Sequence, residues 1–383
     1  MLKILRYNKI MKRLAAAILS VLTALTVLIC GCGGNVPNPY FFNAMHADIT
    51  VTAHGKTDAD FKNFCLDVKE TLSAIEASVS VTDQNSCISK FNRAAAGERV
   101  ELDKCAYDIL SLAKQAYEIT EGYYNPAVYY SVQAFTKEKN VTFTPPSTEV
   151  TDKYKQLADR FGELELTAEN GAYYGVKPNF TVEIGGESYS MKLDLGGIAK
   201  GYAATVIGGI FDKYGYGTGY VDLGNSSVIC KSAKSGGAYT LGMTNPRSQI
   251  GDNYLTTKIQ NTNLSTSGDY RNYFIHDGVR YCHVIDPTTA RPVQTGVYTA
   301  TIIGGDPGLN DAYTTALMAM GKEKAVEFIN KNLSNYRVFF VCEEGIVTNV
   351  PQAGYTLNGN CGYAVINTIS QDGKIILGEQ NVA

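Results

Sequence analysis

The sequence predicts an α+β fold, because strand patterns and helix patterns intermix along the chain without a regular βαβ period. Period-two alternation of apolar residues predicts strands at residues 45–53 and within residues 173–195. Helical spacing of apolar residues instead predicts amphipathic helices over residues 61–75 and 109–117. These patterns, with no internal repeat, indicate one compact two-lobed domain.

The remaining elements follow in order. Residues 78–94 form a polar stretch predicted to be a loop, and residues 120–130 an irregular aromatic segment. A short third helix is predicted over residues 149–161. The second half predicts further strands at residues 220–230, 239–246, 263–274, 281–293, 298–304 and 337–345, with a helix led by Asp311 and another through Ala325 and Ile329.

The N-terminus has the pattern of an export signal. Lys12 and Arg13 precede an apolar run at residues 14–29 that is short for a membrane span of about 20 residues. The following Cys30-Gly31-Cys32 resembles a bacterial lipobox, with Cys32 as the lipidated residue. We therefore expect a lipoprotein signal peptide at 1–32, a tether at 33–40 and the folded domain at 41–383, outside the cytoplasm and lipid-anchored to the bacterial membrane. The alternative is an uncleaved N-terminal anchor helix.

Charge and cysteine content exclude several classes of protein. The net charge of −3 and pI of about 5.9 provide no basic footprint for nucleic acid. The cysteines after the signal are scattered and contain no C-x-x-C pair, which argues against a zinc or iron–sulfur site. Their odd number also argues against a full disulfide framework, so we expect mostly small buried apolar side chains.

The stretch LDLGGIAKGYA, residues 193–203, predicts a strand, a glycine turn and the start of a helix. Gly196 and Gly197 permit unusual φ angles and close backbone approach, and Lys200 and Gly201 fall on the first helical turn. Such a turn suits an anion such as phosphate. It matches neither the P-loop nor the dinucleotide fingerprint, so a plain strand-to-helix turn is the alternative.

A second constellation is NDAYTTALMAMG, in which Asn310 is predicted to cap a helix. Asp311 and Thr315 are four residues apart and so share one helix face. A carboxylate and a hydroxyl, completed by carbonyl, water and phosphate oxygens, suit Mg²⁺. Ordinary helix N-terminal chemistry is the alternative, since Asp favours the positive end of the dipole and Thr bonds back to the helix.

Two further stretches carry polar groups near turns. Ser267, Gly268 and Asp269 are predicted to form a turn that offers donors to a phosphate. His283 and Asp286 lie on a predicted strand that leads into a proline turn. A histidine there is a candidate general base, although a structural histidine is the alternative.

In sequence order, the motifs LDLGGIAKGY, TSGDY, H-x-I-D-P and DAYTTALMAMG, preceded by ISKFN and TEGYYNP, resemble those of the ApbE-like FAD:protein FMN transferases. The resemblance covers most of the chain after the signal. It implies antiparallel sheets flanked by helices, in two lobes with the flavin site between them.

The resemblance also implies roles for particular residues. The Mg²⁺ ligands would be Asp311, Thr315 and the carbonyl of Gly197, and His283 would lie at the reacting end. The remaining residues implied to contact FAD are Met45, Asn92, Tyr124, Lys200, Gly201, Ser267, Gly268 and Asp269.

The implied reaction is Mg²⁺-dependent transfer of FMN from FAD to a threonine hydroxyl of an exported acceptor flavoprotein, with release of AMP. His283 or Asp286 would accept the proton of the hydroxyl. Two alternatives use the same fold: hydrolysis of FAD to FMN and AMP, and FAD binding without catalysis.

Overall fold

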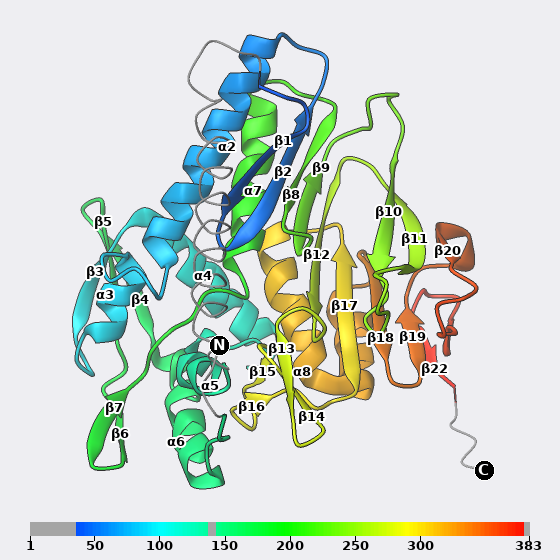
Figure 1. The fold of residues 1–383 in the computed structure, drawn as a ribbon. Coiled ribbons are helices and arrows are strands. Elements are labelled where there is room, and N and C mark those ends of the chain that lie inside the picture. The colour runs from blue at the N-terminus through cyan, green and yellow to red at the C-terminus, as the bar shows by residue number, and fades with distance from the viewer. Residues whose placement is uncertain (1–35, 137–142, 379–383) are drawn as a thin grey trace, which may run out of the picture.

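The computed structural model describes residues 36–136 and 143–378. Its centre is an eight-stranded sheet in the order β1-β2-β8-β9-β12-β17-β18-β19, in which every neighbouring pair is antiparallel (Figure 1). The strands are β1 (Tyr40–Ala44), β2 (Ala47–Ala53), β8 (Gly219–Leu223), β9 (Ser227–Cys230), β12 (Thr262–Gly268), β17 (Val297–Ile303), β18 (Arg337–Cys342) and β19 (Gly345–Thr348).

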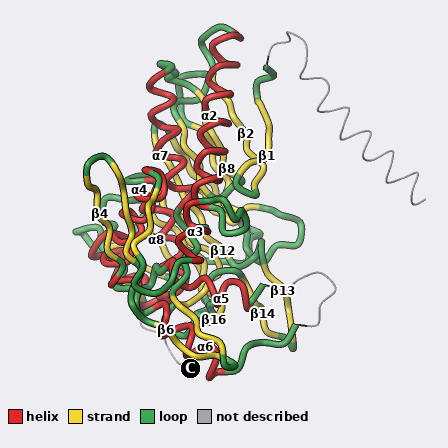
Figure 2. The backbone as a smooth tube through the Cα atoms, turned by 90° about the vertical axis from the view of Figure 1, so that its left-hand side faces the viewer, coloured by secondary structure: helices red, strands yellow, loops and turns green. Residues whose placement is uncertain are grey.

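Long helices cover one face of this sheet. They are α2 (Asp58–Val79), α7 (Ala199–Lys213) and α8 (Pro307–Asn332), and α4 (Lys104–Ile119) packs on α2 and α8. Helix α7 packs between α2 and α8, and Figure 2 shows α2 and α7 alongside β1, β2 and β8. The apolar positions predicted for residues 61–75 and most of those for 109–117 are buried in α2 and α4, which confirms both helices.

The opposite face of the sheet packs on a small sheet in the order β10-β11-β20, formed by Tyr239–Thr244, Asn253–Ile259 and Tyr355–Leu357. Strand β18 shows why both faces are apolar. Phe340 belongs to the core on the helix side, whereas Phe339 and Val341 belong to the core on the small-sheet side. Period-two alternation therefore supplies two hydrophobic layers from one strand.

A second lobe lies beside the helical layer and confirms the two-lobed α+β prediction (Figure 1). It contains α3 (Cys87–Arg93), the sheet β3-β5-β4 (Arg99–Leu102, Ala172–Val176, Glu165–Glu169), the hairpin β6–β7 (Thr181–Ile184, Glu187–Ser190), α5 (Tyr129–Ala134) and α6 (Thr148–Ala158). Short elements complete the chain: η2 (Pro126–Val128), η3 (Phe161–Glu163), β13 (Tyr273–His276), β14 (Val279–Cys282), β15 (Ile285–Asp286), β16 (Arg291–Pro292), η4 (Gln352–Gly354), β21 (Asn367–Ile369) and β22 (Ile375–Leu377).

Some expected elements are wrong. Helix α3 lies within the stretch expected to be a loop, and Ser86 caps it by accepting from the Ser89 N–H. The two helices expected after residue 310 are confirmed, because non-helical angles at Gly321, φ 74° and ψ 174°, divide α8 into a helix that contains Asp311 and a helix that contains Ala325 and Ile329. Asp306 rather than Asn310 caps α8, so Asp311 lies in the second helical turn.

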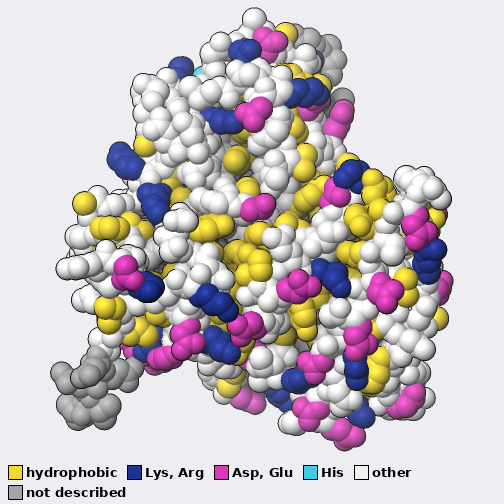
Figure 3. Space-filling view, turned by 180° about the vertical axis from the view of Figure 1, so that it is seen from behind, with side chains coloured by type: hydrophobic (Ala, Val, Ile, Leu, Met, Phe, Trp, Pro, Cys, Tyr) yellow, Lys and Arg dark blue, Asp and Glu magenta, His cyan; other side chains and the backbone are white. Residues whose placement is uncertain are grey.

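The cysteines of the described residues are free, and all but Cys105 are buried, as expected. No helix within residues 36–136 and 143–378 is both long enough and apolar enough to cross a bilayer. The export signal and Cys32 lie outside the described residues, as do residues 33–35 of the expected tether. Seen from behind, the surface interleaves Lys and Arg with Asp and Glu, so no single sign of charge dominates that face (Figure 3).

Candidate active site

A cavity of about 550 Å³ lies where the two lobes meet. Its walls come from the turn before α7, the second turn of α8, the end of β12 and the aromatic segment before η2. This volume falls within the roughly 300–1,000 Å³ that small-molecule and cofactor sites occupy. Of the residues expected to form the site, the following line it: Tyr124, Gly197, Lys200, Ser267, Gly268, His283, Asp311 and Thr315.

The stretch before the glycine turn is extended but pairs with no strand, so the strand expected at residues 191–195 is wrong. The side chain of Asn92 replaces a neighbouring strand. Its amide donates to the Leu193 carbonyl at 2.8 Å, and its oxygen accepts from the Leu193 N–H at 2.7 Å. Asn92 is buried and does not line the cavity, and its side chain positions the stretch before the glycine turn.

The glycines of the turn provide space, not unusual backbone angles, because neither Gly196 nor Gly197 has a positive φ. A Cβ on Gly197 would lie 3.4 Å from Thr315 Oγ1 and 3.5 Å from a ring carbon of Tyr124. The turn therefore lies directly against α8. This contact brings the Gly197 backbone next to the residues predicted to bind a cation.

Gly201 joins α7 to α8. Its N–H donates to Asp311 Oδ2 at 3.0 Å, and a Cβ at this position would lie 2.4 Å from the Pro307 carbonyl oxygen. Gly201 is buried and does not line the cavity. In this structure its N–H orients the Asp311 carboxylate.

Oxygen atoms converge on the α8 wall. Asp311 has an exposed fraction of only 4%, and among the described residues its carboxylate accepts one hydrogen bond, the one from Gly201. Thr315 Oγ1 donates to the Asp311 carbonyl at 3.2 Å and lies 3.2 Å from Ser267 Oγ. Burial raises the pKa of Asp311, against the opposing effects of Lys200 and of the Gly201 N–H.

The donor set fits a hard cation. Within the described residues no three His, Cys, Asp or Glu side chains cluster as a metal site, so one carboxylate, one hydroxyl and a backbone carbonyl would have to suffice. Mg²⁺ is commonly held in this way, by one or two carboxylates with waters and substrate phosphates. The buried Tyr124 hydroxyl also lines the cavity without a hydrogen-bond partner, which indicates that a polar ligand group belongs there.

His283 faces the cavity from the bend between β14 and β15, not from the strand expected there. Desolvation lowers the pKa of His283, Lys200 lowers it further, and the Asn272 carbonyl and the charges of Asp194 and Asp269 act in the opposite direction. The ring Nδ1 lies 3.4 Å from the Asn272 oxygen. A proton on Nδ1 would point toward that oxygen and leave Nε2 as the basic atom.

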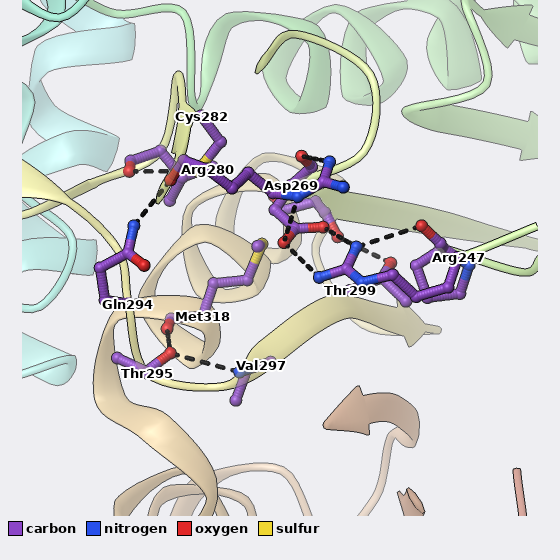
Figure 4. Close-up of polar contacts among 12 residues, drawn as sticks. Arg247, Asp269, Arg280, Cys282, Gln294, Thr295, Val297, Thr299 and Met318 are labelled. Atoms are coloured by element: carbon purple, nitrogen blue, oxygen red, sulfur yellow. Dashed lines mark hydrogen bonds and ion pairs between the residues drawn. The ribbon is translucent and has the colours of Figure 1, made fainter. Parts of the chain in front are cut away.

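The strands β12–β15 form a wall of the cavity that holds Ser267 and His283, and this wall has two sides. Gly268 and Tyr270 line the cavity, whereas Asp269 between them lines a separate cavity of about 220 Å³ behind the wall. There Arg247 donates two hydrogen bonds of 2.7 Å to the Asp269 carboxylate, as Figure 4 shows. The Asp269 carboxylate therefore does not line the cavity that Ser267 and Gly268 line. Ser267 and Gly268 lie at the end of β12 and not in a turn.

Two other expected site residues also lie outside the cavity lining. The Asp286 carboxylate accepts from the N–H and the hydroxyl of Thr288, at 2.8 and 2.7 Å, and so stabilises the proline turn. Met45 has φ 50°, and its N–H donates to Glu76 Oε2 at 2.8 Å. Its neighbours His46, Ala47 and Asp48 line the cavity in its place.

The sequence did not single out Asp194, Tyr270 or Asn272, which all line the cavity. Burial raises the pKa of Asp194, although its Oδ1 accepts from the Gly196 N–H at 2.9 Å. The alternation in Leu193-Asp194-Leu195 was a usable signal, because the two leucines are buried and the intervening carboxylate faces the cavity.

Comparison with known proteins identifies the class to which this fold and site belong. The model of the ApbE family matches residues 45–340, and the chain belongs to this family. It is similar to the FAD:protein FMN transferase of Treponema pallidum, with 27% identity over 265 residues that cover 67% of this chain and 71% of that protein. The FAD:protein FMN transferase of Vibrio cholerae is 25% identical over 276 residues, covering 72% and 78%.

Solved structures show the same architecture. The ApbE protein of Thermotoga maritima superposes with a TM-score of 0.67 at 27% identity, covering 80% of this chain and 95% of that chain. The flavin transferase ApbE of Vibrio cholerae gives a TM-score of 0.66 at 21% identity, with 84% and 96% covered, and supports the fold alone.

Proposed function

We propose that this chain is a FAD:protein FMN transferase that uses Mg²⁺ to move FMN from FAD to a threonine hydroxyl of an acceptor protein, releasing AMP. The observation that carries the proposal is the convergence of Gly197, Asp311 and Thr315 in the cavity that Lys200 and His283 also line. Family membership supports the transferase class.

The residues present fit both the cation and the pyrophosphate. Asp311, Thr315 and the Gly197 carbonyl would hold Mg²⁺, which would neutralise phosphate charge and stabilise the leaving AMP. Lys200, on the first turn of α7, adds a second positive charge where the helix N-terminus already favours an anion. Arg271 lines the same cavity and donates to the Gly224 carbonyl at 2.7 Å, so its guanidinium is held at the rim.

The transfer step needs a group that accepts the proton of the attacking hydroxyl. The hydroxyl oxygen bonds to the FMN phosphorus, the bond from that phosphorus to the oxygen bridging to AMP breaks, and the proton passes to His283 Nε2. The lowered pKa of His283 keeps the imidazole neutral and able to accept a proton at neutral pH. Asp286 is the weaker choice, because its carboxylate is engaged by Thr288 outside the cavity.

The anchoring and location form a separate part of the proposal. Lys12, Arg13, the apolar run at 14–29 and Cys32 support export and attachment by a lipid at Cys32, with acceptors outside the cytoplasm. Cys32→Ser should shift the full-length chain from the membrane fraction to the soluble fraction. Unchanged membrane association of this variant would support an uncleaved anchor helix instead.

The test of the activity is mass spectrometry of exported proteins after incubation with the chain, FAD and Mg²⁺. We expect an FMN adduct on one threonine, with AMP in solution, and loss of both when EDTA is added. Free FMN and AMP without any adduct would favour an FAD hydrolase. Intact FAD after long incubation would favour a binding protein.

A further inference from the structure

The hairpin β13–β14 extends from the wall of the cavity. Its strands pair antiparallel, with Ile275 opposite Arg280, and a two-residue turn at Asp277 and Gly278 joins them. Both turn residues have positive φ, 49° and 77°, as the tight hairpin turn requires. At its other end the hairpin continues into Asn272 and His283, which line the cavity.

The two faces of this hairpin differ. On one face Phe274 and Tyr281 pack on Phe135 and Phe143 in a small aromatic cluster. On the other face Tyr273 and Ile275 have exposed fractions of 43% and 58%. Neighbouring apolar side chains that are exposed on one face of an edge strand often mark a site where another protein binds.

The backbone of β13 is also open along its outer edge. The His283 N–H donates to the Asn272 carbonyl, so Asn272 and His283 form a hydrogen-bonded pair. In an antiparallel ladder the next pairs alternate, which turns the N–H and C=O groups of Tyr273 and Ile275 away from β14. In the described part of the chain β14 is the only strand that pairs with β13.

The edge of β14 is different, because it is already engaged. The Gln294 side chain donates to the Arg280 carbonyl at 2.7 Å, a contact drawn in Figure 4. The Arg280 guanidinium stacks on Tyr273 at 3.7 Å and donates to the Asp269 carbonyl at 3.3 Å. Of the two edges of this hairpin, the β13 edge is therefore the one that combines outward backbone groups with exposed apolar side chains.

We propose that the β13 edge binds an extended segment of the acceptor protein, which adds as a third strand beside Tyr273 and Ile275. This inference rests on the proposed transferase function. Strand addition gives affinity through backbone hydrogen bonds and selectivity through alternate side chains. At about 3.3 Å per residue, a segment paired with Tyr273 reaches the Asn272 and His283 level within one or two residues.

The β13 edge continues into the cavity, and this position favours the acceptor protein as the molecule that binds there. The hydroxyl that attacks phosphorus must arrive beside His283 on a polypeptide, and the β13 edge leads from solvent to that residue. FAD has no strand to add and needs no such edge. The hairpin therefore separates recognition of the acceptor from binding of the nucleotide.

The test compares Ile275→Lys with Ile376→Lys. Ile376 is a matched control, since it is 51% exposed and lies in another two-stranded antiparallel sheet, β21–β22. The probe is the exported protein that the wild-type chain labels with FMN, purified unlabelled after its identification by in-gel flavin fluorescence. Transfer kinetics at saturating FAD give kcat and KM for this acceptor, and flavin fluorescence quenching gives the Kd of FAD.

For Ile275→Lys we expect the acceptor KM to rise about tenfold, because apolar burial is lost and a lysine opposes edge pairing. The kcat and the Kd of FAD should stay within about twofold of wild type. A second readout is hydrogen exchange, in which the Tyr273 and Ile275 amides of the wild-type chain should gain protection when acceptor is added.

Equal acceptor KM values for the two lysine variants, or no gain in amide protection, would overturn the docking proposal while leaving the transferase function intact. A wild-type chain that labels no protein would overturn both together. A tenfold KM increase in Ile376→Lys as well would also contradict the proposal, because the effect would then not belong to β13.

Discussion

The helix pair α7–α8 and the strand wall β12–β15 contribute to the cavity in different ways. On the helix pair, Lys200, Asp311 and Thr315 all line the cavity as their spacing predicts. On the wall, Ser267, Gly268 and His283 line it, but Asp269 and Asp286 do not. Residues four apart share a helix face, whereas on the wall the carboxylates of Asp269 and Asp286 are bound by Arg247 and Thr288, away from the cavity.

This comparison changes how a contiguous motif should be interpreted. The motif TSGDY suggests one nucleotide-binding unit, and Thr266, Ser267, Gly268 and Tyr270 do line the cavity. Asp269, held by Arg247 and 7% exposed, does not line it and supports the wall from behind.

The largest expected effect is on the helix pair. Asp311→Asn keeps an oxygen that can accept from the Gly201 N–H but removes the charge that would hold Mg²⁺. We expect the FMN transfer rate at saturating FAD to fall about a thousandfold, since metal stabilisation of phosphoryl charge is worth several kcal/mol. The melting temperature should remain near that of wild type. Retention of more than a tenth of the rate would exclude Asp311 as a metal ligand.

The next largest effect is expected for a substitution in the strand wall β12–β15. Asp269→Asn leaves Arg247 without its carboxylate, and breaking such a pair should lower the free energy of unfolding by about 3 kcal/mol. Glu163→Gln, which breaks an exposed ion pair with Arg160, should cost at most about 1 kcal/mol. Denaturant unfolding measures both.

The affinity for FAD decides how Asp269 acts. Measured where the variant is folded, the Kd of FAD should change less than about threefold in Asp269→Asn, because the carboxylate lies behind the wall. A variant as stable as wild type that binds FAD tenfold more weakly would contradict the two-sided wall. Such weaker binding would instead support the contact between Asp269 and the nucleotide that the motif suggests.

A smaller effect concerns the contact between α7 and α8. Gly201→Ala would place a Cβ 2.4 Å from the Pro307 oxygen and 2.7 Å from Asp311 Cβ, so the helices must separate, at a cost of about 1–3 kcal/mol. Gly209→Ala in the same helix meets nothing within 4 Å and should stabilise by about 0.5–1 kcal/mol. Opposite signs in thermal unfolding are expected, and a neutral Gly201→Ala would exclude tight packing there.

The smallest effect is a shift in pH dependence. Lys200 lowers the pKa of His283, so Lys200→Met should raise this pKa. Because the neutral imidazole is the active form of a base, the acid limb of the kcat/KM profile should move to higher pH, by less than about one unit. A shift to lower pH, or none, would exclude coupling between the two residues.

The sequence predicted the helices best, because Phe61 to Ile75 and Ile109 to Ala116 repeat over several turns. The four-residue spacing also predicted that Asp311 and Thr315 share one helix face, and both line the cavity. It could not predict that the Asn92 side chain replaces a strand beside Leu193, since that contact joins residues 101 positions apart. The side of the wall that Asp269 faces likewise depends on Arg247, which local pattern does not pair with it.

The most direct test of the account is cation binding at the helix pair, measured by electron paramagnetic resonance of Mn²⁺, which shares the preference of Mg²⁺ for oxygen ligands. With FAD present, the wild-type chain should bind Mn²⁺ tightly enough to remove the signal of the free ion, and Asp311→Asn should leave that signal in place. Equal Mn²⁺ binding by the two proteins would contradict a metal site built from Gly197, Asp311 and Thr315.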